Sequence, residues 1–158
     1  MFTNSEALSP FIPHCLEWIN TVNEGQNPFA QTEQQIEELY QLAYALYQNQ
    51  QYQDACHFFR VLILVDPHRI RHWKGFAATL QMQKCYQEAL DCYAAIAMRY
   101  KESCDAYFYV QVADCYFALK QGEAGLRALQ DAQKVAKRNK DNKVIQHVAF
   151  MRQRWGNS

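Results

Sequence analysis

The chain has 158 residues, with sixteen Lys and Arg against sixteen Asp and Glu, so its formal net charge at pH 7 is zero. It therefore lacks the strong positive field of nucleic-acid and anionic-membrane binders, and we expect no nucleic-acid partner. Hydrophobic residues make up 49% of the sequence, and the five glycines and four prolines are too few for many tight turns, so a folded helical protein is favoured over a disordered one.

The N-terminal segment, residues 1–35, predicts a helix and no targeting signal. Apolar residues recur at helical spacing from Ile12 to Val22, and Gly25 follows as a stop signal. The N-terminal stretch has no basic region, its apolar run is broken by Pro10 and Pro13, and the chain nowhere has eighteen consecutive apolar residues. We expect a cytosolic protein without membrane insertion.

The cysteine pattern points to reduced thiols. The sequence contains no C-x-x-C pair and none of the short spacings of disulfide-dense secreted modules. We therefore expect the six cysteines to be mostly buried small hydrophobic residues: Cys15, Cys56, Cys85, Cys92, Cys104 and Cys115.

A pattern of six residues recurs through the centre of the chain. The first copy is Leu39, Leu42, Ala43, Leu46, Ala55 and Phe59; the second, 34 residues later, is Trp73, Phe76, Ala77, Leu80, Ala89 and Tyr93; the third, after a further 36, is Tyr109, Val112, Ala113, Tyr116, Gly125 and Leu129. This period resembles the tetratricopeptide repeat, and Pro67 falls at the terminal proline of its pattern. The sequence predicts three repeats, at residues 36–69, 70–103 and 104–139.

Small residues in this pattern allow the two helices of each repeat to approach closely. Gly125 replaces the alanine of the earlier copies at a cost of up to about 1 kcal/mol in helix propensity, so we expect a looser third repeat. Beyond the repeats, Val144, Val148 and Met151 predict a C-terminal capping helix within residues 140–158. The predicted fold is all-α: one domain forming a tetratricopeptide-repeat superhelix of three helix pairs, with an N-terminal helix and a cap.

One stripe on the first helix of each repeat is left over once the core positions are assigned. It is offset from them by one residue and should face the concave side of a repeat stack. The predicted peptide-binding groove therefore consists of Tyr40, Tyr44 and Tyr47, then Lys74, Ala78 and Gln81, then Val110, Asp114 and Phe117. Tyrosine suits such a groove because it offers a large rigid surface and a hydroxyl. Packing of the three tyrosines against the N-terminal helix is the alternative.

No catalytic or metal site is predicted. Cys56 and His57 are neighbours that would point about 100° apart on a helix, without a third orienting residue. His68 and His72 with Asp66 lack the spacing of a zinc or iron site, and surface histidines are the preferred interpretation. No cofactor is implied. The basic cluster near the C-terminus is interpreted as a solvated helix face: Lys134, Lys137, Arg138, Lys140 and Lys143.

Three stretches carry a more specific resemblance. "LYQLAYALYQNQQYQDACHFFRVLILVDP", "RHWKGFAATLQMQKCYQEALDCYAAIAM" and "VADCYFALKQGEAGLRALQDA" resemble the class II type III secretion chaperones, the SycD/LcrH-type translocator chaperones. The likeness covers residues 11–135. It implies a bacterial cytoplasmic protein, not an enzyme, that binds hydrophobic type III secretion translocators in its concave groove and keeps them soluble, unassembled and export-competent.

The resemblance also implies how the partner binds. In the family, an extended segment near the translocator N-terminus lies in the groove, which would place it against Tyr40, Tyr44 and Tyr47. Asp114 and Phe117 would serve the third repeat, and Lys74 would hold a carboxylate or carbonyl. The text "EGQNPFAQ" departs from the family's turn after the N-terminal helix. Because that helix often makes the dimer contact, monomer and homodimer both stay open.

Other binding functions fit part of the pattern. A co-chaperone that clamps a C-terminal carboxylate would need Lys and Asn where Tyr40 and Tyr44 stand. A needle-subunit chaperone, a gatekeeper partner or a structural repeat adaptor would use a similar groove, and only the client distinguishes them.

Overall fold

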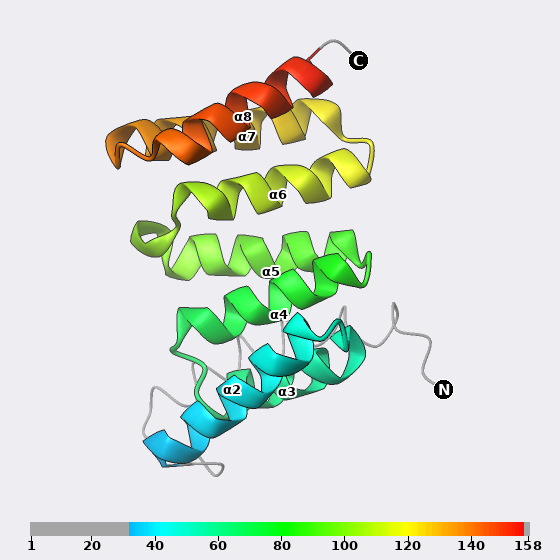
Figure 1. Ribbon diagram of the computed structural model, residues 1–158, viewed down its shortest axis with the longest axis vertical. Coiled ribbons are helices and arrows are strands. Elements are labelled where there is room, and N and C mark those ends of the chain that lie inside the picture. The colour runs from blue at the N-terminus through cyan, green and yellow to red at the C-terminus, as the bar shows by residue number, and fades with distance from the viewer. Residues whose placement is uncertain (1–31, 157–158) are drawn as a thin grey trace. The chain divides into compact units, whose positions relative to one another are not determined.

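The computed structural model describes residues 32–156, and over this range the chain forms helices and no strands (Figure 1). The α-helices are α2 (Glu33–Gln48), α3 (Tyr52–Val65), α4 (Ile70–Met82), α5 (Tyr86–Arg99), α6 (Ala106–Ala118), α7 (Gly122–Arg138) and α8 (Asn142–Trp155), with a 3-10 turn, η1 (Lys101–Ser103). The predicted N-terminal helix and its dimer contact lie outside the described residues.

The chain divides into two compact units, Met1–Ile96 and Ala97–Ser158. In unit 1, α2 packs on α3, α3 packs on α4, and α2 also touches α4. In unit 2, α6 packs on α7, α7 packs on α8, and α6 also touches α8. Each unit thus brings consecutive helices together, as expected for helix-pair repeats.

Four short turns reverse the chain in the same way. Each contains a residue with positive φ, between 56° and 64°: Gln50, Lys84, Lys120 and Lys140. In each, the next residue's amide reaches back into the helix, as where Cys85 N donates to Leu80 O at 3.0 Å. This is the Schellman ending, which usually has glycine at the left-handed position. It makes the two helices on either side of each turn antiparallel.

The second repeat forms the centre of the unit 1 core. Its pattern residues Trp73, Phe76, Ala77 and Leu80 are all buried, and the Trp73 indole donates to the Pro67 carbonyl at 2.9 Å. Pro67 therefore ends the first repeat and also supplies the acceptor for the buried indole. In the first repeat Leu42 stays 45% exposed, although the pattern assigned it to the core.

Two glycines make room for aromatic rings. A Cβ on Gly75 would lie 2.2 Å from the Phe59 ring, and one on Gly125 would lie 2.5 Å from the Phe117 ring. Gly125 is buried, and its missing side chain is the space into which Phe117 packs. The looser third repeat stays a prediction, but at Gly125 itself the missing side chain allows the Phe117 ring to pack closely.

The prediction of an all-α fold built from helix pairs is confirmed over residues 32–156. The helix pairs α4–α5 and α6–α7 fall within the second and third predicted repeat ranges, and α8 falls within the predicted cap. Helix α2 begins at Glu33, three residues before the first predicted range, and α3 lies within that range. The division into three repeats and a cap as one domain stays a prediction. Between residues 32 and 156 no helix has both the length and the apolar character to cross a membrane.

Candidate functional site

The first helices of the two unit 1 pairs carry the first six predicted groove residues. We call these the unit 1 face: Tyr40, Tyr44 and Tyr47 on α2, with Lys74, Ala78 and Gln81 on α4. None of the six is fully buried, and Tyr44 is 44% exposed. The face is thus partly exposed, with aromatic residues on one helix and mainly polar residues on the other.

Tyr40 is held in place by aromatic neighbours. Its ring stacks on Tyr44 with centroids 6.3 Å apart and 11° between the planes. The Phe59 ring meets it edge-on at 6.1 Å, and the His72 ring lies 5.9 Å away. Offset stacking and edge-on contacts are the favoured geometries of aromatic pairs. Tyr40 therefore anchors the stack to the core, and Tyr44 presents its outer part.

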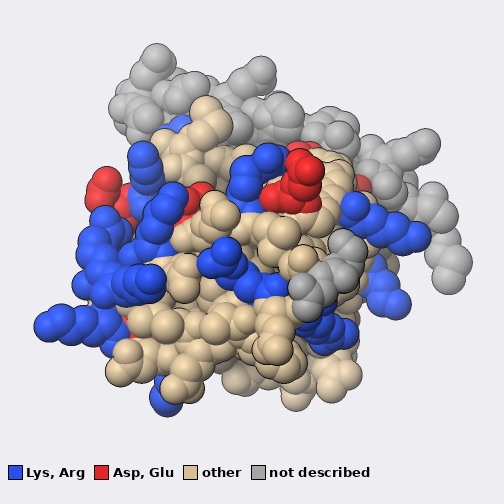
Figure 2. All heavy atoms as spheres, turned by 90° about the horizontal axis from the view of Figure 1, so that it is seen from above, with Lys and Arg blue, Asp and Glu red and all other residues tan. Residues whose placement is uncertain are grey.

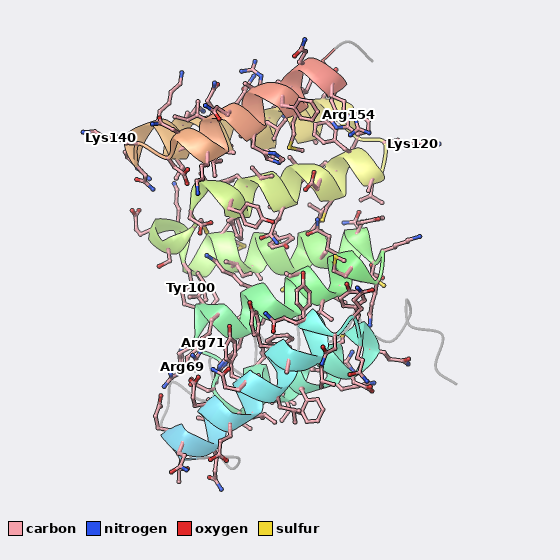
Figure 3. The ribbon with its side chains drawn as sticks, in the orientation of Figure 1. Arg69, Arg71, Tyr100, Lys120, Lys140 and Arg154 are labelled. Carbon is pink, nitrogen blue, oxygen red and sulfur yellow. The ribbon has the colours of Figure 1, made fainter. Side chains whose placement is uncertain are left out.

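Two charged residues that the sequence did not single out complete this cluster. The Arg71 guanidinium lies over the Tyr40 ring, 4.2 Å from its centroid, and donates to Glu37 at 2.5 Å. Hydrogen bonds from Gln41 and Arg71 lower the pKa of the Glu37 carboxyl. Figure 3 shows Arg71 and Arg69 together near the N-terminal half of α2. Because Glu37 and Arg71 lie three residues before Tyr40 and Lys74, extending the stripe by one turn would have found them.

The rest of the unit 1 face is joined to the second helices. Tyr47 meets the Tyr52 ring of α3 edge-on, with centroids 5.6 Å apart. Gln81 accepts a hydrogen bond from the Tyr93 hydroxyl of α5 at 3.1 Å. Such contacts fix the side chains before a partner arrives, which lowers the entropic cost of binding.

His72 corrects the expectation of surface histidines. Its side chain is fully buried, and its Nδ1 lies 3.0 Å from the Asp66 carbonyl oxygen, which can only accept, so Nδ1 carries the proton. Burial lowers the pKa of His72, so it is neutral at pH 7 and serves as a packing partner of Tyr40. His68, by contrast, is exposed. Among the described residues no cluster of His, Cys, Asp or Glu could hold a metal ion.

In unit 2 the three predicted groove residues separate. Val110 and Phe117 lie in the core cluster with Ala113, Leu129 and Val148, and are therefore not exposed for contact with a partner. Phe117 stacks on Trp155 of α8 at 4.7 Å with 5° between the planes. Asp114 is partly exposed, and burial raises the pKa of its carboxyl while His147 opposes the rise. Of this part of the stripe, Asp114 is the accessible member.

An open cavity of about 650 Å³ lies next to the stacked pair. Its apolar lining comes from Phe117, Leu126 and Trp155, and Lys120 and Glu123 also line it. All five belong to unit 2, so the ends of α6, α7 and α8 meet here.

The cysteines lack the features of a nucleophile. Burial raises the pKa of the Cys56 thiol to about 11, and its neighbour His57 is exposed on the helix surface. A thiol that stays protonated at pH 7 is a poor nucleophile. None of the five cysteines in the described part forms a disulfide, and four of them are buried: Cys56, Cys92, Cys104 and Cys115.

Comparison with known proteins supports the fold assignment. The tetratricopeptide-repeat family model matches residues 36–67 and 72–101. No curated protein matches the sequence.

Several solved structures resemble the chain, among them proteins of type III secretion. The structure of PcrH in complex with the chaperone binding region of PopB has a TM-score of 0.70 and 23% identity, covering 77% of this chain and 97% of that one. The Yersinia enterocolitica type III secretion translocator chaperone SycD has a TM-score of 0.69 and 24% identity, and the match covers 76% of this chain and 89% of that one. A chain of the CopN–Scc3 complex has a TM-score of 0.70 and 24% sequence identity, and the match covers 77% of this chain and 71% of that one.

These similarities agree with the repeat pattern and with the helix pairs. Residues 36–67 and 72–101 are tetratricopeptide repeats, and the chain has the all-α repeat fold of PcrH and of the type III secretion translocator chaperone SycD.

Proposed function

We propose that this protein is a bacterial cytoplasmic chaperone that binds a hydrophobic type III secretion translocator and keeps it soluble, unassembled and export-competent. It is a binding protein, and its partner is an extended segment near the translocator N-terminus. The observation that carries the proposal is the partly exposed tyrosine stack on α2, in a fold whose structural neighbours bind translocators.

The neighbours support the choice of client. PcrH has been solved with the chaperone binding regions of PopB and of PopD, and SycD with a peptide of the translocator YopD. Each of these proteins has the same fold as this chain, so a translocator segment is the partner class that the fold favours. Identities of 22–23% to these complexes leave the particular client open.

The unit 1 face has the chemistry to hold an extended segment. Tyr44 offers an exposed ring against which an apolar side chain can pack, and Tyr40 beneath it is already fixed by its neighbours. Lys74 and Gln81 on α4 carry groups that pair with backbone carbonyls, which an extended strand exposes along its length. Apolar contacts would select side chains, and the polar groups would satisfy the backbone.

The client is identified by affinity purification of the tagged protein from its native bacterium with secretion blocked, followed by mass spectrometry. We expect a membrane-active secreted protein to co-purify with the wild type and to be reduced with Tyr44→Ala. Val61→Ala, which truncates a residue of the same 44% exposure on α3, is the matched control and should retain the partner. Recovery of no secreted protein by the wild type contradicts the proposal.

A second candidate function follows from the CopN–Scc3 complex, whose matching chain has the same TM-score as PcrH with PopB. In that case the partner would not be a translocator. It would be a protein that resembles CopN, or a needle subunit, or an adaptor partner that is never exported. The same purification separates these outcomes, because the identity of the co-purifying protein decides among them.

A further inference from the structure

Helix α8 repeats the packing pattern of α6 at an offset of 36 residues. In α6, Phe108 and Cys115 are buried and Val112 is partly buried. The residues 36 positions later, Val144, Val148 and Met151, are the α8 side chains that pack into the unit 2 core cluster. The same side of both helices therefore packs inward.

This offset extends the predicted groove stripe onto α8. Position 44 on α2 corresponds to position 78 on α4, position 114 on α6 and position 150 on α8. Phe150 is 63% exposed, and Lys143 and Gln146 on the same side are exposed as well. Tyr44 and Phe150 are thus exposed aromatic residues at equivalent positions of the first and last described helices.

Asp114 lies on α6, a helix of unit 2 that α8 touches. His147 on α8, three residues before Phe150, lowers the pKa of the Asp114 carboxyl against the effect of burial. We call Asp114, Lys143, His147 and Phe150 the unit 2 face.

Charge indicates what this face would accept. Helix α8 contains Lys143, Arg152 and Arg154 and no Asp or Glu. Although the whole chain is neutral, Ala97–Ser158 contains eleven Lys and Arg against six Asp and Glu, a formal charge of +5. Figure 2 shows Lys and Arg predominating over Asp and Glu on the face seen from above, with uncharged surface between them. An apolar residue flanked by acidic residues complements the α8 part of this face, which has Lys143 and no carboxylate, whereas the carboxyl of Asp114 belongs to α6.

We propose that the unit 2 face is a second client-binding site, in which Phe150 and Lys143 receive an apolar side chain flanked by Asp or Glu from the same secreted client. The inference rests on the proposed function, since it takes the occupant to be a further segment of that client. It assigns α8 a binding role in addition to the capping role that the sequence predicted.

The test is the affinity of the full chain for the purified client, measured by titration with Phe150→Ala and Lys143→Glu. We expect each variant to bind about 3- to 10-fold more weakly, and both should fold because the side chains are exposed. Arg127→Glu on α7 is the matched charge control, exposed in the same unit but outside the face, and should stay within about 2-fold of the wild type.

The possible failures are distinguishable. If the wild type binds no translocator, the proposed function fails, and this inference fails with it. If Tyr44→Ala weakens binding while Phe150→Ala and Lys143→Glu do not, only the second site is wrong. If the two variants instead reduce binding to phosphatidylglycerol vesicles, or shift the sedimentation of the protein alone, the face binds a membrane or a second copy and the inference is overturned.

Discussion

At the scale of single residues, Gly125 shows how a deviation from the repeat pattern can be structural. Its missing side chain accommodates the Phe117 ring, which itself stacks on Trp155. The sequence showed the glycine but not the ring beside it, because the partner lies on another helix. Helix propensity alone therefore does not describe the effect of this glycine, because it leaves out the contact with the ring.

Gly125→Ala should destabilise the protein by about 1–3 kcal/mol, because its Cβ would overlap a ring that cannot move without breaking the stack. Gly122→Ala is the control: nothing lies within 4 Å of its Cβ, and it should gain up to about 1 kcal/mol in helix propensity. Urea denaturation measures both. Equal effects of the two substitutions would contradict the packing role of Gly125.

The Cys115 thiol provides a test by pH. Burial, with a smaller effect from Asp114, raises its pKa from 9.0 to about 12. Above pH 9 the unfolded thiol ionises while the folded thiol stays protonated, so stability falls by up to about 1.4 kcal/mol per pH unit from this group.

Denaturation midpoints at pH 8 and pH 10 should therefore fall less in Cys115→Ala than in the wild type. Comparing slopes removes the constant cost of the smaller side chain. An identical decline in both proteins would show that the thiol does not carry this pH dependence.

At the scale of elements, the turns explain how regularly the helices reverse. Lys84 at φ 64° and Lys120 at φ 61° hold left-handed conformations that favour glycine. Lys84→Gly should stabilise the protein by about 1 kcal/mol, whereas Lys84→Ala should give no such gain because it keeps a Cβ. Thermal unfolding compares the two. A destabilising Lys84→Gly would argue against left-handed strain at this turn.

The helices themselves were largely predictable, because their packing residues recur at a fixed period. The ranges expected for the repeats match the helix pairs, except that α2 begins three residues before its range, and Pro67 marks the end of the first. Less predictable was which residues a neighbouring helix covers. Phe117 has the spacing of the predicted groove stripe, yet the Trp155 ring covers its side chain. That contact joins residues 38 positions apart in the sequence.

At the scale of the whole molecule, neutral composition conceals a division of charge. A net charge of zero argued against a polyanionic partner, but the surplus of cations lies entirely in Ala97–Ser158. Met1–Ile96 contains five Lys and Arg against ten Asp and Glu, a formal charge of −5. Each unit therefore presents its own electrostatic surface to a partner, which the sum over the chain could not indicate.

Part of the candidate site was also predictable from the sequence. The stripe spacing identified Tyr40, Tyr44 and Tyr47, whereas Arg71 and Glu37 were missed because the stripe was begun one turn too late. His72 was placed at the surface because no local pattern shows that Tyr40 packs against it. Spacing predicts which residues share a side of a helix, while contacts between helices decide which of them stay exposed.

The central claim is that the tyrosine stack on α2 binds an extended segment of a translocator. Its most direct test is calorimetric titration of the purified chain with the N-terminal segment of the co-purified client, using wild type, Tyr44→Ala and Val61→Ala. The account predicts binding about 10-fold weaker for Tyr44→Ala and within about 2-fold for Val61→Ala, since Tyr44 alone of the two contributes to the stack. Equal affinities for all three proteins would contradict it.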